Sequence, residues 1–485
     1  MCGVIGIIGT ESSQYNRAVQ ESYNGLLKLQ HRGQDAAGLL FIDESGAFRL
    51  HKQMGLISEV LSSAGIQKAQ SAMCIGHTRY ATTGSNDASN LQPMVLRQPV
   101  TVGMAHNGNL VNYHELARDW LKDHGSLSST NDVELLLKLW CKAYGTEALD
   151  ESFSFDRAVM STKRVLETVD GAYAVVGLIP KYGMIAFRDP KGIRPLVIGK
   201  REDADGVRYC VTSETTALQM IGFQFVRDVK PAEFIWIDTY GNIQSAICTG
   251  ASRASCMFEW VYFAGADSII EGKSVYTSRL ALGQRLADRV QRMMDRTGWK
   301  PDIVCPVPDT SRPSTIALAE VLKVPYREVF IKNRYVQRSF ILNTQEARER
   351  AVQSKLSPIV SEIKDRNILL VDDSIVRGTT SKNIVRMLRK YGAKSVAFGI
   401  TCPPLRHPCF YGIDFPSSKE LVASGKSLDD IAEWIGVDHL IYLDESDLTD
   451  AIDNNICMGC INGCYPTERK GHQEFSQYRR GHDTI

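Results

Sequence analysis

Residues 367–385 read NILLVDDSIVRGTTSKNIV, and this stretch decides the fold of the second half of the chain. Its apolar run, 367–371, predicts a buried strand, and residues 380–390 after the loop predict a helix. The same order recurs on either side, in 303–307 followed by 315–321, and in a strand at 395–400. Strands that alternate with helices are typical of a parallel α/β sheet.

Two adjacent acids, Asp372 and Asp373, end this strand. Their carboxylates can accept hydrogen bonds from ribose hydroxyls and hold Mg²⁺ through its water shell. The Gly-Thr-Thr loop and the helix start suit a phosphate dianion, with Thr379 and Thr380 as added hydroxyl donors. Isolated acids at such a place commonly cap the next helix, but two acids followed by RGTTS form a more specific pattern.

The first half predicts short strands joined by Gly-rich turns, with few helices. The expected strands are 3–8, 36–42, 73–76, 102–106, 172–178 and 184–187. The expected helices are 16–29 and 132–143, the second with a cap at Asn131. Because the character of the sequence changes near residue 251, we predict two domains, 2–245 and 255–485.

Composition excludes several classes of protein. Lys and Arg number 56 against 55 Asp and Glu, a net charge of +1, and no basic stripe indicates a nucleic-acid surface. No apolar run reaches the ~20 residues of a membrane span, and the N-terminus lacks signal-peptide features. Twelve cysteines without an export signal favour the reducing cytoplasm. Six are expected in the core: Cys74, Cys141, Cys210, Cys248, Cys305 and Cys402.

Cys2 is a candidate nucleophile. Removal of Met1 would leave a thiol and a free α-amine on one residue, and an amine with a pKa near ~8 can serve as its base. A carboxamide substrate would then give a thioester and ammonia. A Cys at position 2, taken alone, is usually unremarkable structure.

Three further positions complete the same chemistry. HNGN, residues 106–109, follows a strand and offers the Asn107 amide beside the Gly108 N–H for an oxyanion. Arg79, in GHTRYATTG, could bind a substrate carboxylate in fork geometry. Asp132, at a helix start, could pair with a substrate ammonium.

Five motifs, in order and spacing, resemble the class II glutamine amidotransferases: MCGVIGIIG, HRGQDAAG, GHTRYATTG, HNGNL and FRDPKGIRPL. The resemblance implies an N-terminal-nucleophile hydrolase fold, with two antiparallel sheets between helices. It makes Cys2 the nucleophile and Asn107 with Gly108 the oxyanion hole. It assigns glutamine binding to Arg32, Arg79 and Asp132, with Arg32 on a loop that helps close over the site. The family often has Ser-Asp-Ser/Thr-Glu where this chain has Asn131-Asp132-Val133-Glu134.

The segment around the acidic pair is similar to the phosphoribosyl pyrophosphate (PRPP) motif of type I phosphoribosyltransferases. This resemblance implies that PRPP is bound by Lys332, Asp372, Asp373, Ser374, Arg377, Gly378, Thr379 and Thr380. It implies Mg²⁺ at Asp372 and Asp373, with Thr310 or Ser311 of PVPDTSRPS contributing. KNRYVQRSFI, residues 332–341, resembles a loop that closes over PRPP, with Gln337 and Ser339 replacing the usual Gly and Thr. Gly265-Ala266 likewise replaces a usual Arg-Pro.

Nearly the whole chain resembles the glutamine phosphoribosylpyrophosphate amidotransferase family. That family moves ammonia from glutamine to C1 of PRPP, which opens de novo purine synthesis. The resemblance further implies a homotetramer and feedback inhibition by purine nucleotides. Two alternatives remain: a glutaminase with another acceptor, and a non-catalytic nucleotide sensor, against which the intact Cys2, Asn107 and Asp372 argue.

The C-terminal CxxC, Cys457 and Cys460, is compatible by itself with zinc, a redox pair or two surface thiols. The family resemblance implies instead a [4Fe–4S] cluster on Cys256, Cys409, Cys457 and Cys460, since some members carry one at matching positions. Zinc remains the alternative.

Overall fold

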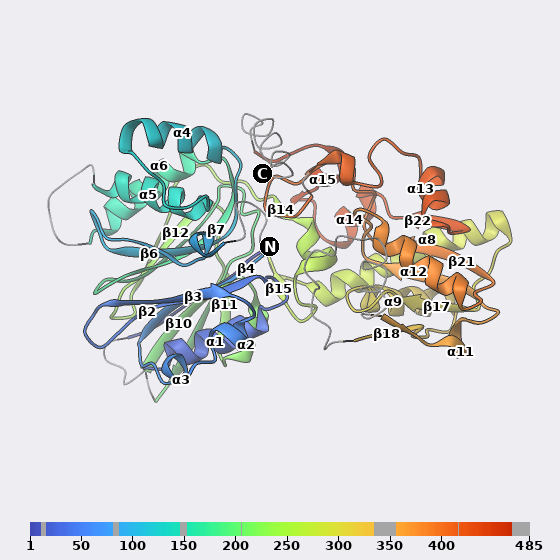
Figure 1. Cartoon of the computed structure of the whole chain (residues 1–485), viewed down its shortest axis with the longest axis horizontal. Coiled ribbons are helices and arrows are strands. Elements are labelled where there is room, and N and C mark those ends of the chain that lie inside the picture. The colour runs from blue at the N-terminus through green and yellow to red at the C-terminus, as the bar shows by residue number, and fades with distance from the viewer. Residues whose placement is uncertain are drawn as a thin grey trace.

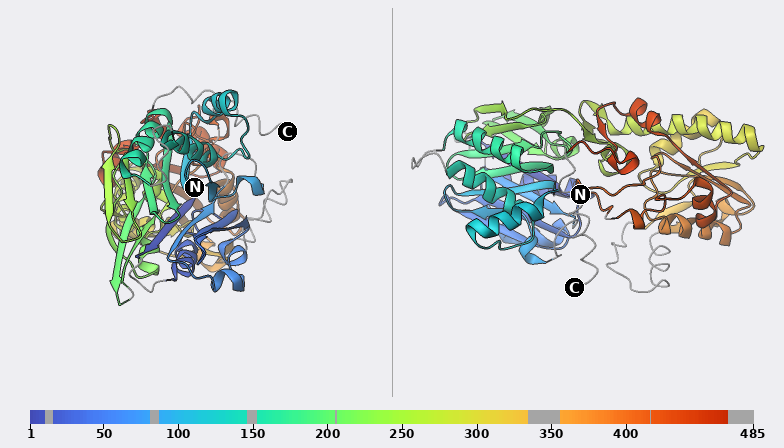
Figure 2. Two further views of the ribbon diagram at one scale, coloured as in Figure 1. Left: turned by 90° about the vertical axis from the view of Figure 1, so that its left-hand side faces the viewer. Right: turned by 90° about the horizontal axis from the view of Figure 1, so that it is seen from above.

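The computed structural model describes residues 1–10, 16–80, 87–145, 153–204, 206–333, 356–415 and 417–467. The chain forms two lobes side by side, and its N-terminus lies at their junction in each of two views (Figure 1, Figure 2). The strands of the two large antiparallel sheets lie between residues 3 and 247, and the parallel sheet lies between residues 303 and 442. The division into 2–245 and 255–485 stays a prediction that this arrangement supports.

Two antiparallel sheets face each other in the first lobe. The seven-stranded sheet contains, in order, β11 (Gln224–Asp228), β9 (Val197–Asp203), β10 (Gly206–Thr212), β1 (Gly3–Gly9), β4 (Met73–Arg79), β2 (Ala36–Ile42) and β3 (Phe48–Met54). The six-stranded sheet contains β13 (Ile243–Ile247), β12 (Glu233–Ile237), β8 (Gly183–Arg188), β7 (Gly171–Ile179), β6 (Val102–Leu110) and β5 (Met94–Leu96).

Three apolar layers hold this lobe together. Between the sheets, Val4 and Ile75 belong to one cluster with Ala105 and Val176. A second cluster joins the outer face of the seven-stranded sheet to α1 (Ala18–Lys28), α2 (Ile57–Val60) and α7 (Thr215–Met220). A third joins the six-stranded sheet to α5 (Asp132–Gly145) and α6 (Phe155–Thr168). Strand β1 is buried at every position because helix covers one face and sheet the other. The predicted sandwich of two sheets between helices is confirmed.

The second lobe contains a parallel sheet in the order β17 (Ile303–Pro306), β20 (Asn367–Asp372), β21 (Ser395–Ile400) and β22 (His439–Tyr442). Its larger helices are α8 (Val275–Thr297), α9 (Arg312–Leu322), α12 (Thr379–Lys390) and α13 (Leu428–Ile435). One apolar cluster covers β17, β20 and β21 on both faces, which explains their uninterrupted hydrophobic sequences. The predicted parallel α/β sheet is confirmed.

Several short elements lie outside the three large sheets. They are β14 (Ser255–Cys256) paired with β23 (Ile456–Cys457), the π-helical segment η2 (Glu259–Phe263), β15 (Ile269–Ile270) paired with β16 (Lys273–Ser274), and β18 (Phe330–Lys332) paired with β19 (Leu356–Pro358). Every strand and helix predicted from the sequence occurs, with bounds that differ by a few residues. The Asn131 cap is confirmed, since its side-chain Oδ1 accepts a hydrogen bond from Val133 N at 3.1 Å.

Within the described ranges, no helix is both long and apolar enough to cross a membrane.

Candidate active sites

Cys2 lies directly before β1, at the junction of the lobes (Figure 1). Its backbone N–H donates to Asn107 Oδ1 at 3.2 Å, and its thiol lies 3.7 Å from the Tyr80 carbonyl oxygen. A Cβ on the next residue, Gly3, would lie 2.9 Å from Thr78 Cγ2. Only glycine therefore lets the chain bring Cys2 this close to β4.

The predicted oxyanion residues lie beside Cys2 at the end of β6. Asn107 is 1% exposed, and its Nδ2 is buried without a hydrogen-bond partner among the described residues. Its Oδ1 is already used by the Cys2 N–H, so this amide has fixed orientation and unused donors. A Cβ at Gly108 would lie 1.8 Å from the Ala172 carbonyl oxygen, so β6 and β7 require glycine here. The pair offers preorganised donors for a developing oxyanion.

Asp132, the first residue of α5, is bound to β6. Its Oδ1 lies 2.9 Å from His106 Nε2, and its Oδ2 accepts from Leu110 N at 3.0 Å. Burial acts to raise the pKa of this carboxyl, but the His106 charge and these hydrogen bonds hold the pKa below its usual range. Asp132 is therefore a buried anion at the strand that carries Asn107 and Gly108.

The two predicted arginines, Arg79 and Arg32, make different contacts. Arg79 ends β4 and is 3% exposed, and Gly33 packs on its backbone, where a Cβ would lie 2.6 Å from the Arg79 carbonyl carbon. Arg32 is fully buried, and its Nε donates to the Cys2 carbonyl oxygen at 3.0 Å. In this structure Arg32 supports the main chain of the nucleophile.

The second site is built at the carboxyl end of β20. Asp372 Oδ1 accepts from Asp373 N at 2.9 Å, and Asp373 Oδ1 accepts from Ser374 Oγ at 2.6 Å. Burial, and then the charge of Asp373, raise the pKa of Asp372 well above its usual value. Burial also raises the pKa of Asp373 to about 6, against the opposing effects of the Ser374 hydrogen bond and the Arg279 charge. A half-buried carboxyl, Asp372, and a buried one, Asp373, both with raised pKa values, fit a site that receives a cation.

The loop after the acids presents the start of α12. Gly378 is the N-cap residue in the left-handed conformation, with φ of 73°, and a Cβ there would lie 2.5 Å from the Trp434 ring. Thr379 and Thr380, in the first turn, are exposed. The first N–H groups of a helix have no intrahelical acceptor and carry the positive end of its dipole, so this turn suits a phosphate. Arg377, beside it, contacts Glu420 at 2.8 Å.

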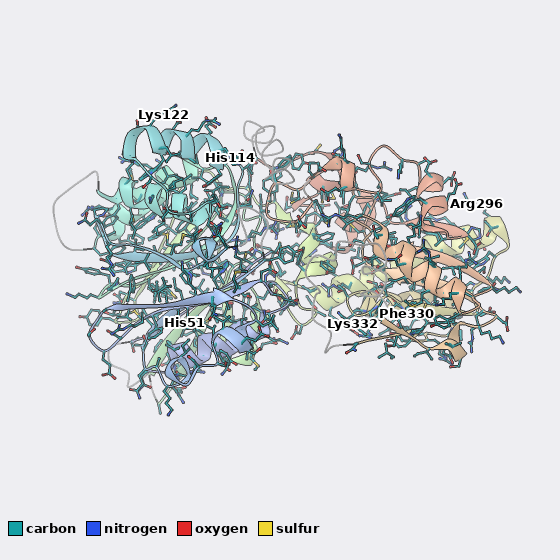
Figure 3. All side chains as sticks on the ribbon, in the orientation of Figure 1. His51, His114, Lys122, Arg296, Phe330 and Lys332 are labelled. Carbon is teal, nitrogen blue, oxygen red and sulfur yellow. The ribbon has the colours of Figure 1, made fainter. Side chains whose placement is uncertain are left out.

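The remaining predicted PRPP residues lie on two neighbouring segments. Lys332 ends β18 (Figure 3), and its Nζ contacts Asp309 Oδ2 at 3.0 Å, which brings it to the 308–311 loop. Thr310 is half-buried in that loop. Ser311 donates its hydroxyl to the Val307 carbonyl oxygen at 2.5 Å and is buried. Gln337 and Ser339 lie outside the described residues.

The predicted cysteine quartet shares one region of the second lobe. Cys256 faces Cys457 in the parallel β14–β23 pair, and burial raises the pKa of the Cys256 thiol to about 11. Burial, followed by the charges of Cys409, Cys402, Cys457 and Cys256, raises the pKa of Cys460. All twelve cysteines are free thiols. In the part of the chain with described placement, no three His, Cys, Asp or Glu side chains form a set for a single metal ion. Cys402, expected as core, is buried and belongs to this group as a fifth thiol.

The lobes meet behind the oxyanion residues. Asn109 Nδ2 donates to the Phe410 carbonyl oxygen at 2.9 Å, and a Cβ at Gly412 would lie 3.3 Å from the Gly108 carbonyl oxygen. The loop that follows Cys409 therefore packs directly on the end of β6.

Sequence reasoning missed four residues that contact or lie near the predicted ones: Glu214, Glu259, His106 and Arg279. Arg32 binds Glu214 and Glu259, Asp132 binds His106, and Arg279 lies near Asp373. His106 could have been found, since it opens the HNGN motif. Glu259 and Arg279 lie in residues 256–283, which resemble the family's interdomain segment, but that resemblance gave neither a role, and Glu214 lies in a stretch with no local signal.

Comparison with known proteins supports both the glutamine amidotransferase interpretation of the first lobe and the phosphoribosyltransferase interpretation of the second. A family model for a glutamine amidotransferase domain matches residues 77–220, and one for a phosphoribosyl transferase domain matches residues 277–412. The amidophosphoribosyltransferase of Escherichia coli K12 is 41% identical over 500 residues, which cover 100% of this chain and 96% of that protein. The Pasteurella multocida enzyme of that name is 43% identical, over 93% of this chain and 89% of its own length.

A solved structure of glutamine PRPP amidotransferase from B. subtilis, complexed with ADP and GMP, is also similar. It is 37% identical with a TM-score of 0.83, over 96% of this chain and 98% of that one. A solved structure of the allosteric regulatory enzyme of purine biosynthesis has a TM-score of 0.84 at 37% identity, over 96% of both chains. The chain belongs to the amidophosphoribosyltransferase family.

Proposed function

We propose that the chain hydrolyses glutamine at Cys2 and transfers the ammonia to C1 of PRPP. The products are 5-phosphoribosylamine, glutamate and pyrophosphate, in the first committed step of de novo purine biosynthesis. The observation that carries the proposal is the presence, in one chain, of Cys2 against the Asn107 amide and of Asp372 and Asp373 before the exposed α12 N-terminus. Family membership supports the same pairing of sites.

In the glutamine half, the Cys2 thiolate attacks the carboxamide carbon and the C–N bond breaks to release ammonia. The α-amine of Cys2, freed by loss of Met1, takes the thiol proton and gives it to the leaving nitrogen. Water then hydrolyses the Cys2 thioester, which releases glutamate and restores the thiol. Asn107 Nδ2 and Gly108 N–H bind the oxyanion, and Arg79 binds the substrate carboxylate. We assign the substrate ammonium to Asp132, a buried anion. We assign to Arg32 support of the Cys2 carbonyl.

In the PRPP half, the α12 N-terminus with Ser374, Gly378, Thr379 and Thr380 holds the 5-phosphate, and Arg377 lies at its edge. Asp372 and Asp373 bind the ribose hydroxyls and favour positive charge as the C1–O bond to pyrophosphate breaks. Bound Mg²⁺ would neutralise the pyrophosphate charge, held by these acids and by Thr310 or Ser311. Lys332 would pair with the pyrophosphate once released from Asp309.

We also propose a structural [4Fe–4S] cluster on Cys256, Cys409, Cys457 and Cys460. These thiols fit it because they share one region, none is in a disulfide, and the Arg194 charge lies near Cys256 and Cys409. When bound, the cluster would crosslink three chain segments, because the thiolates of those segments would be its ligands. Iron and acid-labile sulfide assays on anaerobically purified protein test it, with zinc instead of iron as the contrary result.

The oligomeric state, the compartment and the inhibitors are inferred from the family of the chain. We propose a homotetramer in the cytoplasm, inhibited by purine nucleotides. All twelve cysteines being free supports the reducing compartment. The B. subtilis relative was solved with ADP and GMP, which supports the nucleotide class.

The test is glutamate release from glutamine, with and without PRPP and Mg²⁺, under anaerobic conditions. We expect PRPP to stimulate glutamate release and to give pyrophosphate. Cys2→Ala should lose the reaction with glutamine and keep the reaction with ammonium. Glutamate release that ignores PRPP, with no pyrophosphate formed, would contradict the proposal and indicate another acceptor.

A further inference from the structure

A buried ion group lies directly behind Cys2. Arg32 Nη2 contacts Glu259 Oε1 at 2.8 Å, and Arg32 Nη1 contacts Glu259 Oε2 at 3.1 Å and also Glu214. The side chains of Arg32, Glu214 and Glu259 are at most 1% exposed. With Nε on the Cys2 carbonyl oxygen, Arg32 connects the nucleophile's main chain to both glutamates.

The two glutamates come from opposite sides of the junction. Glu214 immediately precedes α7 in the first lobe, whereas Glu259 opens η2, after the strands of the first lobe have ended. Glu214 also accepts from Gly265 N at 2.8 Å and from Ser268 Oγ at 2.6 Å. The segment 259–268 is therefore attached to the Cys2 side at both of its ends.

The other side of η2 is bound by Arg279 of α8. Arg279 Nε donates to the Trp260 carbonyl oxygen at 2.8 Å, and its Nη2 donates to those of Tyr262 at 3.1 Å and Ala264 at 2.8 Å. The same arginine is 3% exposed, and its carbonyl oxygen accepts from Ser314 Oγ of α9 at 2.8 Å. Because α9 begins directly after the 308–311 loop, the residue that holds η2 is also bonded to the helix beside the second site.

The Gly265-Ala266 departure lies in this segment. A Cβ at Gly265 would lie 2.7 Å from Asp267 Oδ1 and 3.3 Å from Glu214 Oε2. Glycine thus permits the close approach of the Gly265 N–H to Glu214. Asp267 is itself held by Lys28 at 2.8 Å and by Thr216 Oγ1 at 2.8 Å.

We propose that Glu259 is a positioning residue for Cys2, acting through Arg32, and that η2 connects Cys2 to the second site through Arg279 and α9. Removal of one partner from a buried ion group leaves the other charge uncompensated, so Arg32 would shift when Glu259 is neutralised. Misplacement of a nucleophile by about 1 Å can cost on the order of 100-fold in rate. π-Helical turns of this kind frequently lie at functional sites. This inference rests on the proposed function.

The test compares Glu259→Gln with Glu271→Gln in the full chain. Glu271 is the matched control, because this half-buried glutamate, which lies between β15 and β16, also forms an ion pair to the first lobe, with the buried Arg188 at 2.9 Å, but does not contact Arg32. Two rates are measured with and without PRPP and Mg²⁺: alkylation of Cys2 by an electrophilic glutamine analogue, and pyrophosphate release with ammonium. The kcat and KM for glutamine are determined separately.

For Glu259→Gln we expect kcat with glutamine to fall ~10-fold or more, with KM and the ammonium reaction changed by less than ~3-fold. PRPP should no longer accelerate alkylation of Cys2. Glu271→Gln should keep that acceleration even if its melting temperature falls. Gly265→Ala retains every charge and should weaken the acceleration in the same direction, which provides a second variant if Glu259→Gln does not fold.

If PRPP still accelerates the alkylation of Cys2 fully in Glu259→Gln, this inference is overturned, whereas the proposed function is not. Equal losses with glutamine and ammonium also overturn it, because they would indicate a general structural defect. Wild-type protein that forms no pyrophosphate from PRPP and ammonium would overturn the proposed function, and this inference with it.

Discussion

In the proposed mechanism, the Asn107 side chain contacts the nucleophile Cys2 with one end of its amide and leaves the other end for the substrate. Oδ1 accepts the Cys2 N–H at 3.2 Å, and the buried Nδ2 has no partner within the described residues. Asn107→Asp would retain an oxygen for Cys2 and replace the donor by an acceptor. We expect kcat with glutamine to fall ~10²–10³-fold, as for loss of one oxyanion donor.

The measurement is steady-state kinetics with glutamine and, separately, with ammonium. The ammonium reaction should stay within ~2-fold of wild type, since Asn107 lies in the first lobe. A loss of similar size with both nitrogen donors would contradict the oxyanion role.

We expect Asp373 to destabilise the ligand-free protein at neutral pH. Its raised pKa, about 6, means that the folded state holds the proton more tightly than the unfolded chain. The contribution to stability is therefore present below the unfolded pKa near ~4 and is lost as pH rises through about 6. Asp373→Asn should stabilise the ligand-free protein by about 1–3 kcal/mol at pH 7 and abolish PRPP turnover.

Thermal unfolding at several pH values checks this. The melting temperature of Asp373→Asn should exceed that of wild type by ~2–4 °C per kcal/mol at pH 7, and the difference should vanish near pH 4. A difference independent of pH would exclude titration of Asp373 as its cause. Mg²⁺ with PRPP should raise the wild-type melting temperature and leave the variant unchanged.

At the scale of elements, the start of α12 depends on one glycine. Gly378 combines a φ of 73° with a ring 2.5 Å from any added Cβ. Gly436, at the C-cap of α13, has a φ of 89° and open space around its Cβ position. Gly378→Ala should raise the KM for PRPP by ~10-fold or more and cost about 2–4 kcal/mol, whereas Gly436→Ala should cost only about 1 kcal/mol.

Urea unfolding and PRPP saturation kinetics on both variants separate backbone strain from the clash with Trp434. If Gly378→Ala and Gly436→Ala changed the affinity for PRPP equally, PRPP binding would not depend on the present position of the α12 N-terminus.

Elements whose parts are adjacent in sequence could be predicted. The strand, acids, loop and helix of 367–390 need only local pattern, and β1 with Cys2 is similarly contiguous. The contacts that place the side chains could not be predicted, because they join distant residues without a periodic signal. Arg32 and Glu259 are 227 positions apart, and Asn109 and Phe410 are 301 apart. The glutamine-binding role of Arg32, which the resemblance implies, stays a prediction, and its contacts with the Cys2 carbonyl and two glutamates could not be read from the sequence.

At the scale of the whole molecule, the proposed cluster would join three distant segments. Cys457→Ser should reduce the iron content from about four per chain and lower the melting temperature of the anaerobic protein. Cys464→Ser is the matched control, because Cys464 is exposed and lies in the same C-terminal segment. Iron analysis with calorimetry checks both variants. Equal iron in wild type and Cys457→Ser would contradict the ligand assignment.

The β14–β23 pair has a consequence for the order of biosynthesis. Both sheets of the first lobe are complete by residue 247, so they can fold while the ribosome is still translating. Strand β14 must wait for Ile456 and Cys457, about 200 residues later. The adjacent Glu259 therefore reaches its final setting against Arg32 only after residues 456 and 457 have been synthesised. A nascent or truncated chain would carry a folded Cys2 site without its support, and cells would be spared glutamine consumption by chains that have no second lobe to use the ammonia.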